Sequence, residues 1–151
     1  MIHPVRMNIY AIAAIGLVFS TCAMAKTQQP PEVAIQHMST AFANQGMCSV
    51  RFSLETTLGD GDAGTVTVDV AFIDKQKKEV ARGQLVADLT DSTAGRYQEV
   101  NVEGKDMCLD PDTTVVVRKA RAENQGKRFD LLKLKKIRSS SFHPYPITFG
   151  R

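Results

Sequence analysis

Apolar and polar residues alternate one by one along several short stretches of this chain. In the clearest stretch, residues 65–73, every second residue from Val66 to Phe72 is Val or Phe. Successive side chains of a β-strand point to opposite faces of the sheet, so this pattern is typical of a strand with one buried face. Three further stretches have strand character: 48–58, 80–89 and 96–102. Turn-forming residues separate these stretches and no helical pattern lies between them, so the sequence predicts an all-β fold.

A hairpin is predicted towards the C-terminal end of the chain. Its first strand, 113–122, is rich in Thr and Val, whose branched side chains favour a pleated backbone. Residues 123–126 supply turn chemistry that ends in Gly126, and we expect the returning strand at 128–134. These two strands bring the expected number to six.

Residues 33–42 have two interpretations. As a helix, the segment would begin after Pro31 and carry Ala34, Met38 and Phe42 on one face. As an edge strand, it would bury one of its faces imperfectly. The periodicity fits both, so the choice between helix and strand stays open. A strand here would give seven short strands separated by turns, which is the arrangement of a β-sandwich.

The first 25 residues have the three parts of a secretory signal peptide. Arg6 lies in a short polar opening, an apolar run covers 9–19, and Ala23-Met24-Ala25 forms a cleavage site of small residues. The run is too short to span a bilayer as a helix, so we expect no stable membrane insertion. An N-terminal membrane anchor and a lipid on Cys22 are the alternatives. The expected protein is exported, secreted or periplasmic, with a signal peptide at 1–25, a β-sandwich domain at 26–138 and an extended C-terminal tail at 139–151.

Two cysteines remain in the expected mature chain, Cys48 and Cys108. Two cysteines allow only one intramolecular pairing, and an exported protein meets an oxidising compartment. A disulfide between them would stabilise the fold by roughly 4 kcal/mol in the chain-entropy model. No CxxC spacing indicates redox chemistry, and too few His or Cys residues lie nearby for a closed zinc site.

The hairpin also contains a motif with regular spacing. It reads Leu109-x-Pro111-x-Thr113-x-Val115-x-Val117, followed by Gly126 at the tip. This motif resembles the F–G hairpin of fibronectin type III domains, which are binding and spacer modules. The resemblance implies a seven-stranded fibronectin type III/Ig-like antiparallel β-sandwich with one disulfide. In that strand order the second and fifth strands are antiparallel neighbours, which would bring Cys48 and Cys108 to the same pole of the sandwich.

The chain departs from the fibronectin pattern in two respects. Val115 stands where that family often has a tyrosine, and the chain has no tryptophan for the core. The resemblance therefore implies that Phe52, Phe72 and Phe129 fill the volume that a core tryptophan usually takes.

A small exported sandwich with one disulfide is also similar to the interleukin receptor mimic (IrmA) family of pathogenic enterobacteria. That family is similar to the fibronectin modules of cytokine receptors, forms dimers and is implicated in binding host interleukins. The resemblance implies a secreted, non-enzymatic protein-binding module of a Gram-negative bacterium that engages host cytokines and forms a homodimer. The alternative is a periplasmic envelope factor, namely a chaperone, an inhibitor or an assembly subunit.

Positive charge gathers on and beyond the last hairpin, although the formal net charge of the whole chain is only +3. A positive edge of this kind either resists edge-to-edge aggregation or docks an acidic protein partner. For the second case the candidate partner-binding residues are Arg118, Arg121 and Lys133.

The tail supplies three further candidates, Phe142, Tyr145 and Phe149. Aromatic side chains on a tail are costly to leave in water. Either the tail packs along its own sandwich and closes an open edge, or it is an arm that binds a partner or exchanges between the protomers of a dimer.

No catalytic residue, cofactor or metal site is predicted. His37 and His143 have no carboxylate or nucleophile at a telling spacing, and the chain contains no GxSxG, HExxH or P-loop motif. The acidic residues near 60–64 and 106–112 fit turns better than calcium loops. The modest net charge and the export signal argue against nucleic-acid binding.

Overall fold

The computed structural model describes residues 29–42, 44–56, 63–90, 96–105, 107, 112–140 and 145–150. The strands are β1 (Val33–Phe42), β2 (Met47–Thr56), β3 (Gly64–Ile73), β4 (Glu79–Leu89), β5 (Tyr97–Lys105), β6 (Thr114–Asn124), β7 (Lys127–Asp130), β8 (Ile137–Ser139) and β9 (Ile147–Phe149), and a 3-10 helix, η1, covers Asn44–Gly46. The predicted all-β fold is confirmed. The expected seven strands are corrected to nine within the described residues.

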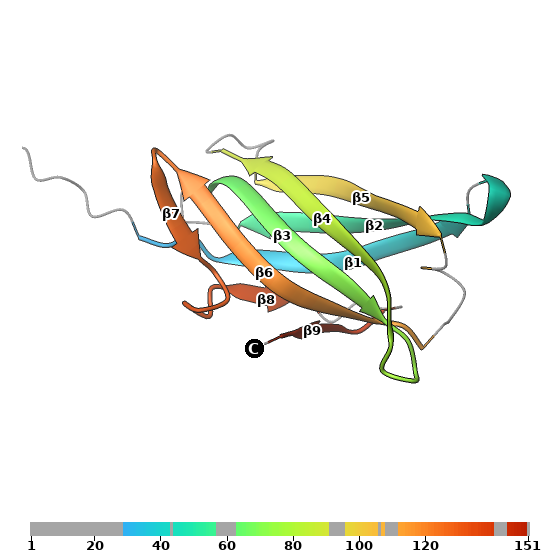
Figure 1. Ribbon diagram of the computed structural model, residues 1–151. Coiled ribbons are helices and arrows are strands. Elements are labelled where there is room, and N and C mark those ends of the chain that lie inside the picture. Colours follow the sequence, from blue (N-terminus) through green and yellow to red (C-terminus); the bar gives the residue numbers. More distant parts are fainter. Residues whose placement is uncertain are drawn as a thin grey trace, which may run out of the picture.

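The strands form two sheets that pack face to face (Figure 1). One sheet has the order β5-β2-β1-β8, and the other has the order β4-β3-β6-β7, with β9 also pairing with β6. The first, second and fifth strands therefore share one sheet, while the third, fourth, sixth and seventh share the other. The second and fifth strands are antiparallel neighbours in one sheet, as the fibronectin resemblance implied. The two additional strands, β8 and β9, come from the end of the chain.

The segment that the sequence left open between helix and strand is β1. It pairs antiparallel with β2, and Val33 and Ile35 on its inner face are fully buried. Branched side chains favour strands, and the partner strand satisfies the backbone, so the strand prevails here over a weak helical period. The register shifts between His37 and Ser39, as at a β-bulge.

The last hairpin differs from its prediction in the returning strand, which ends at Asp130 rather than at 134. Gln125 and Gly126 at the tip both have positive φ, 47° and 75°, as a tight hairpin turn requires. The chain then makes a single helical turn, because the N–H of Leu134 donates to the carbonyl oxygen of Asp130 and the N–H of Lys133 donates to its Oδ1. A carboxylate in this position caps a turn, which explains why the strand does not continue.

The end of the chain is built into both sheets. β8 runs parallel to β1 at the edge of one sheet, and β9 runs parallel to the first part of β6 in the other. The N–H of Val115 donates to Pro146 O and the N–H of Gly150 donates to Val117 O, both at 2.9 Å. β9 therefore packs along its own sandwich and closes an edge there, which is the first of the two interpretations of the tail.

The core lies between the sheets and contains the predicted aromatic pair. Phe52 and Phe72 come from opposite sheets, both are fully buried, and their ring centroids are 6.3 Å apart. Phe129, the third residue expected there, is only partly buried at the edge of the core. At Gly83 of β4 the two sheets approach closely, since a Cβ at this position would overlap the side chain of Val102 in β5.

Candidate functional site

The predicted basic residues of β6 lie on the outer face of the five-stranded sheet. In the pairing with β3, Lys119 lies opposite Asp69 and Val117 lies opposite Val70, so Arg118 is left over as a bulge. Arg118 and Lys119 are both exposed, although strict alternation would point one of them inwards. The bulge thus places two consecutive cations on the same surface.

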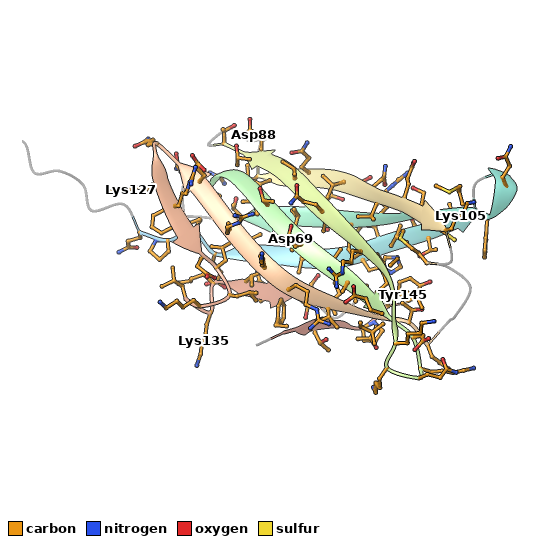
Figure 2. The ribbon with its side chains drawn as sticks, viewed as in Figure 1. Asp69, Asp88, Lys105, Lys127, Lys135 and Tyr145 are labelled. Atoms are coloured by element: carbon orange, nitrogen blue, oxygen red, sulfur yellow. The ribbon has the colours of Figure 1, made fainter. Side chains whose placement is uncertain are left out.

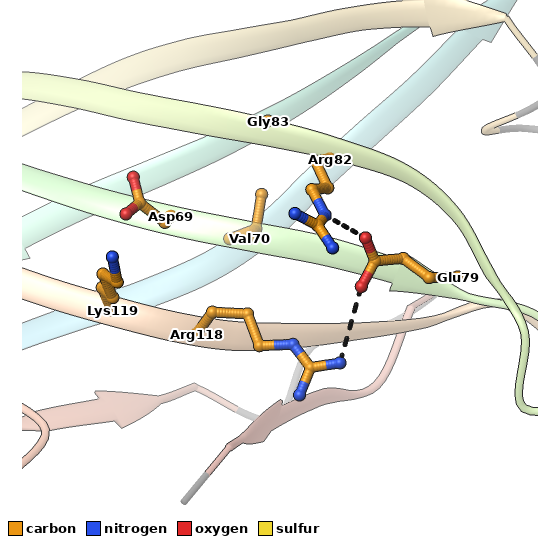
Figure 3. Close-up of a pocket in the computed structure, with 7 residues that line it drawn as sticks. All are labelled: Asp69, Val70, Glu79, Arg82, Gly83, Arg118 and Lys119. Carbon is orange, nitrogen blue, oxygen red and sulfur yellow. Dashed lines mark hydrogen bonds and ion pairs between the residues drawn. The ribbon is translucent and has the colours of Figure 1, made fainter.

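Two hollows adjoin this bulge. The first, which we call the paired hollow, has a volume of about 510 Å³. It is lined by Asp69, Val70, Glu79, Arg82, Gly83, Arg118 and Lys119 (Figure 3). The second, which we call the cationic hollow, has a volume of about 530 Å³. It is lined by Arg118, Lys119, Ala120, Arg121, Asp130, Leu132, Lys133, Phe149 and Gly150.

Charges in the paired hollow largely neutralise one another. Glu79 accepts from Arg82 and lies 3.6 Å from Nη2 of Arg118, so one carboxylate holds two guanidinium groups (Figure 3). The hydrogen bond from Arg82 lowers the pKa of Glu79, and the charge of Arg118 lowers it further. These contacts orient side chains on the sheet surface and leave little net charge for a ligand.

The cationic hollow brings together four of the six residues predicted to bind a partner. Arg118, Arg121, Lys133 and Phe149 all line it, although they come from β6, the helical turn and β9. Phe149 is 37% exposed. Sequence reasoning missed Leu132, because we placed it within a continuous returning strand. Asp130 was the signal for a turn there, because an Asp side chain readily accepts from the backbone N–H three residues later.

Tyr145 has to be removed from the partner-binding candidates, because its side chain lies in the core with only 5% exposure. Its ring stacks on His37 at a centroid distance of 4.8 Å and an interplanar angle of 15°. Its hydroxyl donates to Met107 O at 3.4 Å, and Figure 2 shows the side chain at the end of the sandwich near the start of β6. Tyr145 thus fixes the tail to the body of the domain, while Phe142 lies outside the described residues.

His37 is a packing residue in the core. It is 1% exposed, and its Nδ1 accepts from the N–H of Tyr145 at 3.3 Å. Because Nδ1 is the acceptor, Nε2 carries the proton and donates to Oγ1 of Thr40 at 2.9 Å. Burial lowers the pKa of His37, which keeps the ring neutral at neutral pH.

Cys48 is buried at the start of β2, opposite Gly104 near the end of β5. These two strands are antiparallel neighbours, as the fibronectin resemblance implied. Cys108 lies outside the described residues, and so do the predicted signal peptide and Cys22.

The described residues contain no group of three or more His, Cys, Asp or Glu side chains that could hold a metal ion. Within the same parts of the chain, no helix has the length and apolar character needed to cross a bilayer.

Comparison with known proteins identifies the family. A family model described as IrmA, interleukin receptor mimic protein A, matches residues 33–139. IrmA from Escherichia coli has a similar structure, with a TM-score of 0.60 and 23% sequence identity over 78% of this chain and 98% of that chain. At this identity the structural likeness shows a shared fold, and no curated protein sequence matches the chain. Since the family model extends from the start of β1 to the end of β8, most of the sandwich, this chain belongs to the IrmA family of interleukin receptor mimic proteins.

Proposed function

We propose that this chain is an exported, non-enzymatic receptor mimic that binds a host cytokine of the interleukin class. The observation that carries the proposal is the match of residues 33–139 to a family described as an interleukin receptor mimic. The description names a mimic of a binding protein and not an enzyme. The distribution of β1 to β7 between two sheets, as in fibronectin type III domains, supports the same role.

The surface proposed for this interaction is the outer face of the five-stranded sheet. It carries exposed cations on neighbouring strands, and the cationic hollow adds apolar side chains beside them. Partner surfaces of complementary charge accelerate encounter, while apolar contacts slow dissociation. An acidic face on the cytokine would therefore suit this surface best.

The proposal includes export and a disulfide. Cleavage after Ala25 would leave a mature chain that begins at Lys26. We also propose that Cys48 pairs with Cys108, since Cys48 faces the end of β5 and Met107, next to Cys108 in the sequence, is buried.

The direct test is binding of the purified mature chain to a panel of human interleukins, measured by biolayer interferometry. We expect saturable binding to at least one interleukin, with an on-rate that falls as salt increases. Arg121→Glu should lower that on-rate roughly tenfold at low salt, because it reverses a charge in the proposed face.

Lys105→Glu is the matched control, since it makes the same charge change at the end of β5 in the other sheet (Figure 2). Equal losses in both variants would remove this face from the site. A folded chain that binds no interleukin would contradict the proposal.

A further inference from the structure

The cationic hollow lies where two strand ends converge on one edge. β7 pairs with β6 from Asn124 back to Arg121, whereas β9 pairs with it from Val115 forward to Val117. The two short strands therefore run towards each other along β6. They leave the bulge residues, Arg118 and Lys119, in the interval between them.

Within this interval most of the positive charge is not compensated. Of the four cations that line the hollow, Arg118 forms an ion pair with Glu79 of the neighbouring paired hollow. In the described parts of the chain, Lys119, Arg121 and Lys133 form no ion pair. The one carboxylate in the lining, Asp130, lies opposite Arg121 in the β6–β7 pairing and accepts from the backbone N–H of Lys133, so it offsets one of the four positive charges and the lining stays net positive.

Apolar side chains are present in the same hollow. Phe149 at the end of β9 is 37% exposed, and Leu132 in the helical turn is partly buried. Both line the hollow together with Ala120. The volume of about 530 Å³ lies within the range of about 300–1,000 Å³ that is usual for ligand pockets. The hollow thus offers apolar contact surrounded by cations.

We infer that the cationic hollow binds an acidic segment of the protein partner, with an apolar side chain between its carboxylates. Carboxylates would pair with Arg121 and Lys133 at the rim, while the apolar side chain contacts Phe149 and Leu132. This inference rests on the proposed function for the nature of the partner and adds the chemistry of the segment that is recognised. Sulfated polysaccharides would satisfy the cations, but they have no group suited to the apolar contact.

The test uses short blocked peptides as probes of the full mature chain. One peptide has the sequence Glu-Glu-Leu-Glu-Glu, a second replaces its Leu by Ser, and a third replaces its Glu residues by Lys. Binding is followed by two-dimensional NMR of ¹⁵N-labelled protein, which locates the site by its amide shifts. We expect the acidic leucine peptide to shift amides of 118–121, 131–133 and 149–150, the acidic serine peptide to bind more weakly, and the basic peptide to cause no shift.

Two variants separate the charged contacts from the apolar contact. Arg121→Glu combined with Lys133→Glu should lower the affinity for the acidic leucine peptide about tenfold or more, since two ion pairs are lost. Phe149→Ala should reduce the preference for leucine over serine and leave the salt dependence unchanged. Lys105→Glu should bind each of the three peptides with the same affinity as the parent protein.

The outcomes distinguish this inference from the proposed function. If heparin oligosaccharides shift the same amides and the leucine and serine peptides bind equally, the hollow is a general polyanion site and the inference is wrong. Absence of shifts with every peptide also overturns it, even if an interleukin binds elsewhere. Selective binding of the leucine peptide without binding of any interleukin would support the inference and contradict the proposed function.

Discussion

Gly64 shows how much a single residue determines at the first position of β3. Its φ is +62°, and a Cβ at this position would overlap the carbonyl oxygen of Glu123 in the neighbouring strand β6. The residue therefore needs both the backbone freedom and the small size of glycine. Gly46 has a similar φ of +76°, but a Cβ there would have no described neighbouring atom within 4 Å. This residue therefore needs only the backbone freedom of glycine.

We expect Gly64→Ala to destabilise the fold by about 3 kcal/mol, because left-handed strain and steric overlap add together. Gly46→Ala should cost about 1 kcal/mol, from backbone strain alone. Urea denaturation of both variants measures the difference. If both variants lose the same free energy of unfolding, the close contact between Gly64 and β6 is relaxed in solution.

His37 makes the attachment of the tail sensitive to acid. The ring contacts Tyr145, Thr40, Phe52 and the backbone of Ser39, none of which is acidic. Protonation would put an N–H on Nδ1, facing the N–H of Tyr145 that Nδ1 now accepts from. Because burial lowers the pKa of His37 in the folded state, its contribution to stability is complete above its ordinary pKa of 6.5 and falls as the pH drops below that value.

The expected result is a loss of thermal stability between pH 7.5 and 5.5 that is smaller in His37→Asn, whose side-chain oxygen can accept the same hydrogen bond without titrating. The variant should be less stable overall, since asparagine fills less of the core. Melting temperatures over this pH range provide the measurement. Parallel curves for the two proteins would show that other groups cause the acid sensitivity.

At the scale of elements, prediction from sequence succeeded where a strand is long enough to show alternation. The stretches 65–73 and 80–89 correspond closely to β3 and β4. β8 and β9 have three residues each, too few for a period, and both pair in parallel with residues more than 30 positions earlier in the sequence. For the same reason the cationic hollow could be predicted only as a collection of residues, because its geometry depends on where β7 ends and β9 begins.

β9 and Tyr145 can be tested together by deleting residues 141–151. We expect the deletion to destabilise the domain by about 3 kcal/mol or more, since a buried aromatic residue is lost. It should also promote self-association, because the edge of β6 beside Val115 and Val117 would be left without its partner strand. Urea denaturation and light scattering measure these effects.

Tyr145→Phe serves as the milder variant. It keeps the ring on His37 and loses the hydrogen bond from the hydroxyl to Met107 O, so it should lower the free energy of unfolding by about 1 kcal/mol and remain in the parent's oligomeric state. A deletion variant as stable as the parent would mean that the tail contributes little in solution.

For the whole molecule, the proposed disulfide between Cys48 and Cys108 connects the beginning of β2 to the chain that follows β5. If it forms, the native protein should gain two hydrogens in mass on reduction, and reduction should lower the free energy of unfolding by roughly 4 kcal/mol. Mass spectrometry of native protein from medium and periplasm also gives the first residue of the mature chain. An unchanged mass on reduction would leave Cys48 as a buried thiol.

The pairing of β8 with β1 has a consequence for the order of assembly. Val33 lies opposite Ile137, so the first strand of the fold is completed at its edge by one of the last. Contacts this distant in sequence slow folding, because a long loop must close before they form. A nascent chain that lacks β8 and β9 therefore leaves both sheets without a paired strand, and the sandwich is complete only after these two strands have been synthesised.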